Sequence, residues 1–307
     1  MLSLIENGQL GDGERDRLLA RAAEMKTAAP VLGITGTGGS GKSSLTDELI
    51  RRLRLDQQDT ISVALLAIDP TRRKTGGALL GDRIRMNAIE HERIYMRSIA
   101  TRDAANEVPD GVPAMVAACR LAGVDLVIVE TPGIGQGDAG IVSLSDVSLY
   151  VMTPEFGAAS QLEKIDMLDF ADVIAINKLE RKGGDDALRD VRKQVQRNRQ
   201  AFAQSVDDMP VFGTIAARFN DDGVTALYQT IVAELDHHGL TLQPGSLPKV
   251  DTRESTRQSV IIPSSRQRYL SDVADTLRRY HAETDAAATI ARAVSYTHLT
   301  LPTIYSV

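Results

Sequence analysis

The amino-acid sequence predicts an α/β protein built on a doubly wound, mostly parallel β-sheet that is followed by a helical linker region. Three observations lead to this prediction. Between residues 29 and 239, short apolar runs alternate with longer stretches of helical periodicity, the order typical of βα units. Runs such as ISVALLAI at residues 61–68 are apolar at almost every position, which indicates strands covered on both faces. Beyond residue 239 the chain turns to proline, glycine and arginine, and then to a long helical pattern.

The expected elements follow one another in a simple order. Residues 13–27 are rich in helix formers and stop before Pro30, which predicts a lead-in helix within an N-terminal segment, 1–28. The apolar runs that predict strands are 31–35, 61–68, 94–99, 126–129, 147–152, 173–177 and 211–214. The stretches of helical spacing between and after them are 43–54, 83–90, 113–122, 158–168, 185–203 and 224–238.

The C-terminal part is expected to differ from the rest. Pro244, Gly245 and Pro248 mark a linker, and an arginine-rich stretch then leads into an amphipathic helix expected at 265–293, so we assign 240–294 to a linker and helical region. Residues 295–307, SYTHLTLPTIYSV, resemble a translated sequencing adapter. We interpret them as a non-native tail and expect the natural chain to continue past Val294.

Composition excludes several classes of protein. The 307 residues are 43% hydrophobic and 25% charged, with a net charge of −6 and no long basic run, which disfavours a nucleic-acid partner. No apolar run approaches the roughly 20 residues of a membrane span, and the polar N-terminus does not resemble a signal peptide. The single cysteine, Cys119, excludes an internal disulfide and reads as a small core residue. We therefore expect a cytoplasmic protein without a membrane partner.

A phosphate-binding motif follows the first expected strand. Residues 36–43, GTGGSGKS, match G-x-x-x-x-G-K-[ST] between that strand and a helix, which makes the predicted fold that of a P-loop NTPase. The glycines let successive backbone N–H groups turn toward one anion, and the helix N-terminus adds its positive end. Lys42 is expected to reach the β- and γ-phosphates, and the Ser43 hydroxyl to bind Mg²⁺.

A second motif indicates which base is bound. Residues 177–180, NKLE, follow the apolar run VIAIN and look like the guanine-recognition motif N-K-x-D. A carboxylate at the fourth position accepts hydrogen bonds from both N1–H and the exocyclic amine of guanine, whereas adenine lacks that pair of donors. That carboxylate is Glu180, one methylene longer than the usual aspartate. The sequence therefore favours GTP and GDP, and we assign 29–239 to a P-loop GTPase domain.

Two further carboxylates end buried strands. Asp69 follows the strand at 61–68, and Glu130 follows the strand at 126–129, so both are expected at the ligand-facing edge of the sheet. Glu130-Thr-Pro-Gly133 looks like the D-x-x-G switch motif with glutamate in the first place, and the Gly133 N–H is the expected sensor of the γ-phosphate. Such carboxylates, together with Ser43 and water, suit Mg²⁺.

The segments after these strands complete the predicted site. Residues 71–86 are polar, basic and glycine-rich, and read either as a mobile loop that closes over a triphosphate or as a solvated surface loop. In the first reading, Asp82 is a second metal candidate and Arg85 contacts phosphate or ribose. Ile134 stands where Ras-like switches carry the water-orienting glutamine, and Gln136 is the nearest glutamine, so we predict slow hydrolysis that depends on a partner. The expected catalytic residues are thus Lys42, Gly133 and Gln136.

Together, TGTGGSGKSS at 35–44, LLAIDPTRRKTGGALLGDRIRM at 65–86, VIVETPGIGQ at 127–136 and NKLE at 177–180 resemble the G-protein chaperones of cobalamin-dependent acyl-CoA mutases. In this family the domain uses GTP to gate cobalamin loading and to protect the mutase. The resemblance implies GTP/GDP and Mg²⁺ as ligands. It also implies fused or separate mutase domains, of the isobutyryl-CoA or methylmalonyl-CoA type, as the partner through which cobalamin enters.

The resemblance also implies a set of site residues. The nucleotide contacts that it implies are Gly39, Ser40, Gly41, Lys42, Ser43, Ser44, Arg85, Asn177, Lys178, Leu179 and Glu180. The metal ligands that it implies, some through water or backbone, are Ser43, Ile68, Asp69, Asp82, Glu130 and Thr131.

Parts of such a mutase are absent from the chain. The cobalamin motif D-x-H-x-x-G is approached at 236–241, where Thr241 replaces the glycine, so we read that stretch as exposed polar residues of a helix end. A mutase barrel would need about 250 further residues. We therefore expect a fragment that holds the GTPase domain and linker of a fused mutase.

Three other readings are weighed against this one. Arg72, Arg73, Arg83 and Arg85 keep a P-loop kinase for small molecules possible, and a nucleotide-dependent assembly module without hydrolysis is a further alternative. The histidines at 91, 237 and 238 lack metal-ligand spacing, which disfavours a nickel chaperone. A homodimer through the C-terminal helix stays open.

Overall fold

In the computed structural model the described residues are 1–25, 28–70, 86–101, 108–133, 139–157, 162–256 and 269–299, with only the backbone described at 269, 270, 272 and 295–299. The chain divides into two compact units, Met1–Thr256 and Arg257–Val307. The first unit contains the sheet and the second contains one long helix, α9 (Tyr269–Leu299).

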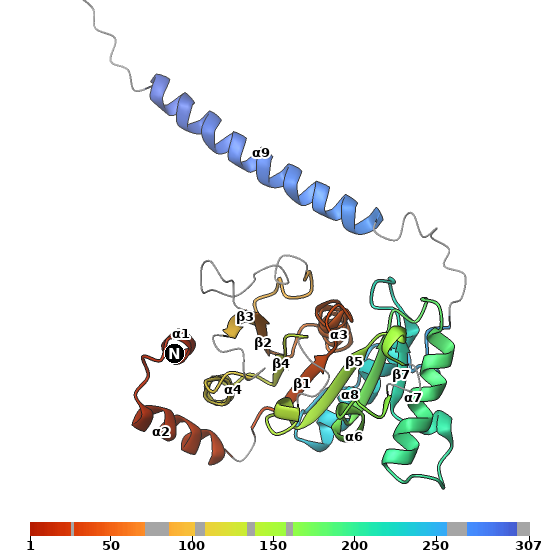
Figure 1. Cartoon of the computed structure of the whole chain (residues 1–307). Coiled ribbons are helices and arrows are strands. Elements are labelled where there is room, and N and C mark those ends of the chain that lie inside the picture. Colours follow the sequence, from red (N-terminus) through yellow and green to blue (C-terminus); the bar gives the residue numbers. More distant parts are fainter. Residues whose placement is uncertain are drawn as a thin grey trace, which may run out of the picture. The chain divides into compact units, whose positions relative to one another are not determined.

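A seven-stranded, all-parallel sheet is the framework of the first unit (Figure 1). Its order is β3-β2-β4-β1-β5-β6-β7, and every pairing is parallel. The strands are β1 (Val31–Gly36), β2 (Val63–Pro70), β3 (Ile94–Thr101), β4 (Leu126–Glu130), β5 (Val147–Met152), β6 (Val173–Asn177) and β7 (Val211–Thr214). Because the chain winds outward in both directions from β1, the predicted doubly wound α/β fold is confirmed.

Helices cover both faces of the sheet. One core cluster lies between the sheet and α1 (Leu2–Glu6), α2 (Asp12–Ala23), α4 (Val112–Leu121), α6 (Met167–Phe170) and α7 (Gly184–Asn198). The other lies beneath α3 (Lys42–Asp56) and α8 (Asp222–His237). Three short 3₁₀ turns complete the described elements: η1 (Ala139–Ile141), η2 (Pro154–Phe156) and η3 (Val206–Asp208). Strands β1, β4, β5, β6 and β7 are buried along their whole length, which explains why their sequences are mostly apolar.

Several expected helices differ from the observed ones. The lead-in helix expected at 13–27 is α2, which ends at Ala23, and the short helix α1 precedes it without having been expected. The expected helix at 83–90 is wrong over its described part, 86–90, which is not helical. The Ala88 N–H donates to Asp47 (2.7 Å) and its carbonyl accepts from Arg54 (2.8 Å), so contacts with α3 replace helical hydrogen bonds.

Two further expected helices differ from the observed elements. Of the helix expected at 158–168, only residues 162–168 are described: Leu162 is helical, a turn follows it, and α6 begins at Met167. The helix expected at 185–203 ends at Asn198, and Gln200 then takes a left-handed conformation (φ 53°) that ends the helical run.

The first compact unit extends beyond the boundary expected at residue 239. Leu240 is buried, and Leu242, Leu247 and Val250 pack against the core beneath α3 and α8. Residues 240–256 therefore belong to the first unit, and the helix of the second unit continues to Leu299, into the segment interpreted as non-native. Within the described residues, no helix combines the length and apolarity that crossing a bilayer would require.

Cys119 lies in the core on α4, as expected from its apolar surroundings. Burial raises the pKa of its thiol to about 11, so the reactive thiolate is scarce at neutral pH. We expect Ellman's reagent to find no rapidly reacting thiol in the native protein and one thiol per chain after unfolding in guanidinium. Rapid stoichiometric labelling of the native protein would contradict this placement.

Candidate functional site

A cavity of about 440 Å³ opens at the carboxyl edge of the sheet, where β1, β2 and β4 end. The loop between β1 and α3 forms its floor with residues such as Gly39, Lys42 and Ser43. Ile68 and Asp69 from β2 line one side, and residues 130–133, from the end of β4 onward, line another. Such an edge is the usual ligand crevice of an open parallel sheet, and it gathers candidates from four separate motifs.

The loop between β1 and α3 has the backbone of an anion cradle. Gly39 and Gly41 have positive φ angles of 73° and 87°, which residues with side chains rarely adopt. Gly41 is the N-cap of α3 and provides no capping side chain, so the first N–H groups of this 15-residue helix face the cavity end of the loop. Among the described residues, the buried hydroxyls of Thr37 and Ser40 have no hydrogen-bond partner, which fits a loop prepared for an anionic ligand.

Lys42 lies deep in this loop. Its Nζ donates to the carbonyls of Gly36 (3.0 Å) and Thr37 (3.2 Å), and the residue is only 8% exposed. Gly133 lies directly against it, because a Cβ at position 133 would be 2.4 Å from that Nζ. The expected γ-phosphate sensor and the expected phosphate-binding lysine are therefore adjacent, in a place where no side chain larger than hydrogen fits.

An oxygen-rich group lies on the other side of the cavity. Glu130, at the end of β4, accepts hydrogen bonds from Ser43 Oγ (2.6 Å) and Thr46 Oγ1 (2.8 Å). Asp69 is buried at the end of β2 and lines the same cavity. Carboxylates and a serine hydroxyl are the donors that Mg²⁺ prefers, so these residues fit that ion. Thr131 also lines the cavity, and its hydroxyl donates to Thr35 on β1 (2.8 Å).

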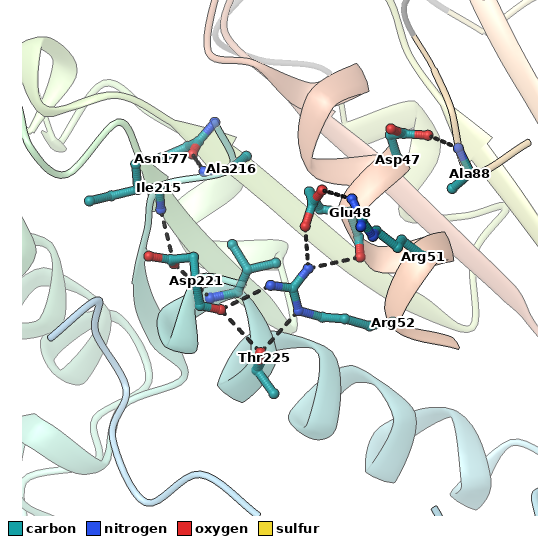
Figure 2. Close-up of polar contacts among 11 residues, drawn as sticks. Asp47, Glu48, Arg51, Arg52, Ala88, Asn177, Ile215, Ala216, Asp221 and Thr225 are labelled. Atoms are coloured by element: carbon teal, nitrogen blue, oxygen red, sulfur yellow. Dashed lines mark hydrogen bonds and ion pairs between the residues drawn. The ribbon is translucent and has the colours of Figure 1, made fainter. Parts of the chain in front are cut away.

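The NKLE segment is joined to the glycine-rich loop. Asn177 is buried at the end of β6, and its Nδ2 donates to the Ser40 carbonyl (2.8 Å). Its Oδ1 accepts from the Ala216 N–H (3.0 Å), which lies just after β7 (Figure 2). Lys178 has a left-handed backbone (φ 61°), and its Nζ donates to the Gly39 carbonyl (2.6 Å). These bonds place the start of NKLE beside the phosphate loop.

The last two residues of NKLE have different surroundings. Leu179 is buried against β7, where a Cβ at Gly213 would be 2.7 Å from its side chain. Glu180 is exposed. Burial of the leucine fixes the turn, and the exposed glutamate is left accessible to a ligand.

The remaining candidates lie outside the described residues: Asp82, Arg85 and Gln136.

The structure adds two residues that the sequence did not suggest. Thr46 lies one helical turn after Lys42, and its hydroxyl donates to Glu130 and also contacts the Lys42 carbonyl (3.0 Å). The i, i+4 spacing from Lys42 was the sequence signal that could have indicated Thr46. Ala216 contributes its backbone N–H, which donates to Asn177, and in the sequence only its position just after an expected strand could have indicated this role.

Asp236, His237 and His238 are exposed at the end of α8, in agreement with their reading as polar helix residues. Within the part of the chain that the structure describes, no three His, Cys, Asp or Glu side chains come together as a group able to hold a metal ion.

Comparison with known families gives a match over most of the chain. The model of the family described as Methylmalonyl Co-A mutase-associated GTPase MeaB matches residues 1–273. A fused isobutyryl-CoA mutase of Cupriavidus metallidurans is 61% identical over 293 residues, which are 95% of this chain and 26% of the relative. A protein of the same name from Nocardia farcinica is 62% identical over 284 residues, 92% of this chain and 26% of its own. The chain thus spans about a quarter of the length of these curated relatives.

Solved structures show the same fold at low sequence identity. HypB from Helicobacter pylori in complex with nickel is 14% identical, with a TM-score of 0.52, and the match covers 75% of this chain and 99% of that one. The hydrogenase maturation factor HypB from Archaeoglobus fulgidus is 15% identical, with a TM-score of 0.50 and coverage of 73% and 99%. At these identities the likeness concerns the fold alone.

Proposed function

Because the chain belongs to the MeaB family of methylmalonyl-CoA mutase-associated GTPases, we propose that it binds and hydrolyses GTP with Mg²⁺. We propose further that it acts as a chaperone, gating cofactor loading into a cobalamin-dependent acyl-CoA mutase and protecting that mutase. The observation that carries the guanine-nucleotide part is the hydrogen bond between Asn177 and the Ser40 carbonyl (2.8 Å). It joins a predicted base-reading segment to a predicted phosphate loop within one site.

Different residues of the cavity would bind different parts of GTP. The loop at 39–44 would hold the phosphates through its N–H groups, with Lys42 placing its charge beside the terminal phosphate. Gly133, adjacent to Lys42, would report the γ-phosphate through its N–H. Asn177 would fix the loop after β7, and Glu180 would accept from the guanine edge. Outside the described residues, Arg85 is proposed as a further phosphate or ribose contact.

The metal would be held by Ser43, Asp69 and Glu130, with the Ile68 carbonyl, Thr131 and Asp82 as further ligands in the proposal. When bound, Mg²⁺ would neutralise charge on the β- and γ-phosphates. Thr46 supports this group by binding the second carboxylate oxygen of Glu130 (2.8 Å), which fixes the orientation of the carboxylate. Gln136 is proposed to orient the attacking water, and because it does not directly follow Gly133, we expect hydrolysis to be slow without a partner.

The proposed partner is a mutase. Relatives at about 60% identity carry the name fused isobutyryl-CoA mutase, and this chain covers only about a quarter of them. The partner would be mutase domains of the isobutyryl-CoA or methylmalonyl-CoA type, fused or separate. These domains would respond to the nucleotide state of this chain and would bind the cobalamin. The isomerase activity would belong to those domains and not to this chain.

Competition with a fluorescent GDP tests the nucleotide assignment. We expect GTP and GDP to displace the probe about 100-fold better than ATP and ADP, since a carboxylate that accepts two hydrogen bonds rejects a base without those donors. The substitution Glu180→Ala should remove most of this preference, whereas Glu234→Ala, at an exposed position of α8, should not. Equal competition by ATP would overturn the guanine assignment and favour a P-loop kinase, which phosphate transfer to an acceptor would then identify.

A further inference from the structure

The segment by which the chain leaves the first unit is bonded to β7. The Gly213 N–H donates to the Arg253 carbonyl (3.0 Å), and the Ser255 N–H donates to the Gly213 carbonyl (2.9 Å). Two glycines permit this approach, because a Cβ at Gly213 would be 3.3 Å from the Glu254 side chain and a Cβ at Gly223 only 2.7 Å from the Ser255 nitrogen. Residues 252–256, which we term the exit segment, are thus held beside the strand that leads to Ala216.

Asp221 joins this exit segment to the loop after β7. One carboxylate oxygen accepts from the backbone N–H groups of Ile215 (3.2 Å) and Val224 (3.0 Å), which caps α8. The other accepts from the Ser255 hydroxyl (2.6 Å). The carboxylate is 1% exposed, and burial raises its pKa while these hydrogen bonds oppose that rise. Because Ile215 precedes Ala216, the carboxylate holds the peptide unit immediately before the one whose N–H donates to Asn177.

A buried arginine holds the opposite side of the same loop (Figure 2). Arg52, on α3, donates to the Asp221 carbonyl (2.9 Å) and to the Thr225 hydroxyl (3.0 Å). Its charge is paired with Glu48 (2.6 Å) one helical turn earlier. Since α3 also begins at the phosphate loop, the loop after β7 is fixed between the helix that carries Lys42 and the exit segment.

From these contacts we propose that Asp221 and Ser255 are positioning residues of the guanine site: the exit segment, through Ser255 and Asp221, sets the loop that places the Ala216 N–H on Asn177. This inference rests on the proposed guanine-nucleotide function. It extends the site to a segment whose residues do not line the cavity. A change in the exit segment would then alter base recognition while leaving the phosphate loop in place.

The test compares base selectivity, defined as the Kd of ADP divided by the Kd of GDP, in variants of the whole chain. Ser255→Ala removes one hydroxyl from the exit segment, and loss of one such hydrogen bond should lower the selectivity about fivefold. Asp221→Ala should lower it further. Asp221→Asn should retain most of it, because an amide oxygen can still accept from the two backbone N–H groups. Ser246→Ala is the matched control, since Ser246 donates to the Leu55 carbonyl (2.9 Å) and has no bond to the loop.

Steady-state hydrolysis gives a second readout. For Ser255→Ala we expect the KM for GTP to rise about fivefold while kcat changes by less than about twofold, because the phosphate side of the site is untouched. A lower Tm with unchanged selectivity and unchanged KM would overturn the proposal, since Ser255 would then be merely structural. If the wild type itself does not discriminate GDP from ADP, the proposed function fails and this inference falls with it. Should Asp221→Ala not fold, Ser255→Ala and its control still decide the question.

Discussion

Replacing Lys42 with alanine is expected to weaken GTP binding about 100-fold and to reduce hydrolysis about 1,000-fold, as loss of a charge-assisted phosphate contact would do. The expectation follows from the position of the side chain: its Nζ lies deep in the glycine-rich loop, bonded to the Gly36 and Thr37 carbonyls. No other described lysine lines the cavity except Lys178, whose Nζ is bonded to the Gly39 carbonyl (2.6 Å). Isothermal calorimetry with a non-hydrolysable GTP analogue and single-turnover hydrolysis of GTP measure the two effects.

The matched control for this change is Lys193→Ala, which removes a lysine from an exposed position on α7. It should leave both quantities within about twofold, because an exposed charge far from a site has little effect at physiological salt. Thermal unfolding of the ligand-free proteins establishes that Lys42→Ala retains the fold. Hydrolysis at the wild-type rate in the folded variant would contradict the role assigned to Lys42.

The strands were the part of the fold that sequence could predict best. The expected bounds of β5, β6 and β7 match the observed ones, because buried parallel strands are apolar throughout and end at polar or glycine residues. Helix expectations failed where distant contacts decide the backbone. Residues 86–90 have a helical pattern, yet Asp47 accepts from the Ala88 N–H and Arg54 donates to the Ala88 carbonyl. No local periodicity contains that information.

The candidate site divides in the same way. The positions of Lys42 and Ser43 could be predicted from one contiguous motif, because a glycine-rich turn between strand and helix has few possible conformations. The link between Asn177 and Ala216 could not, since it joins two strands through a backbone N–H that carries no side-chain signal. The Asp221–Ser255 contact is still less visible, because Ser255 lies in a stretch that the sequence assigned to a linker.

Replacing Glu130 with glutamine is expected to separate metal dependence from nucleotide binding. Glutamine keeps the size of the buried side chain, and its amide oxygen can still accept from Ser43 or Thr46, but the negative charge is lost. We expect Mg²⁺ to stimulate hydrolysis about 100-fold less in this variant, in line with the several kcal/mol that a bound metal contributes to phosphoryl transfer. GDP binding in EDTA should change by less than about threefold, because the phosphate loop and NKLE are untouched.

The control Glu92→Gln, at an exposed position before β3, should leave the Mg²⁺ response unchanged. A normal Mg²⁺ titration of hydrolysis in Glu130→Gln would show that the carboxylate serves only to orient Ser43 and Thr46. A loss of GDP binding in EDTA would instead mean that the charge of Glu130 maintains the shape of the phosphate loop. We expect Glu130→Gln to retain GDP binding and to lose the response to Mg²⁺. This result follows if the carboxylate of Glu130 holds the ion while the loop after β1 holds the phosphates.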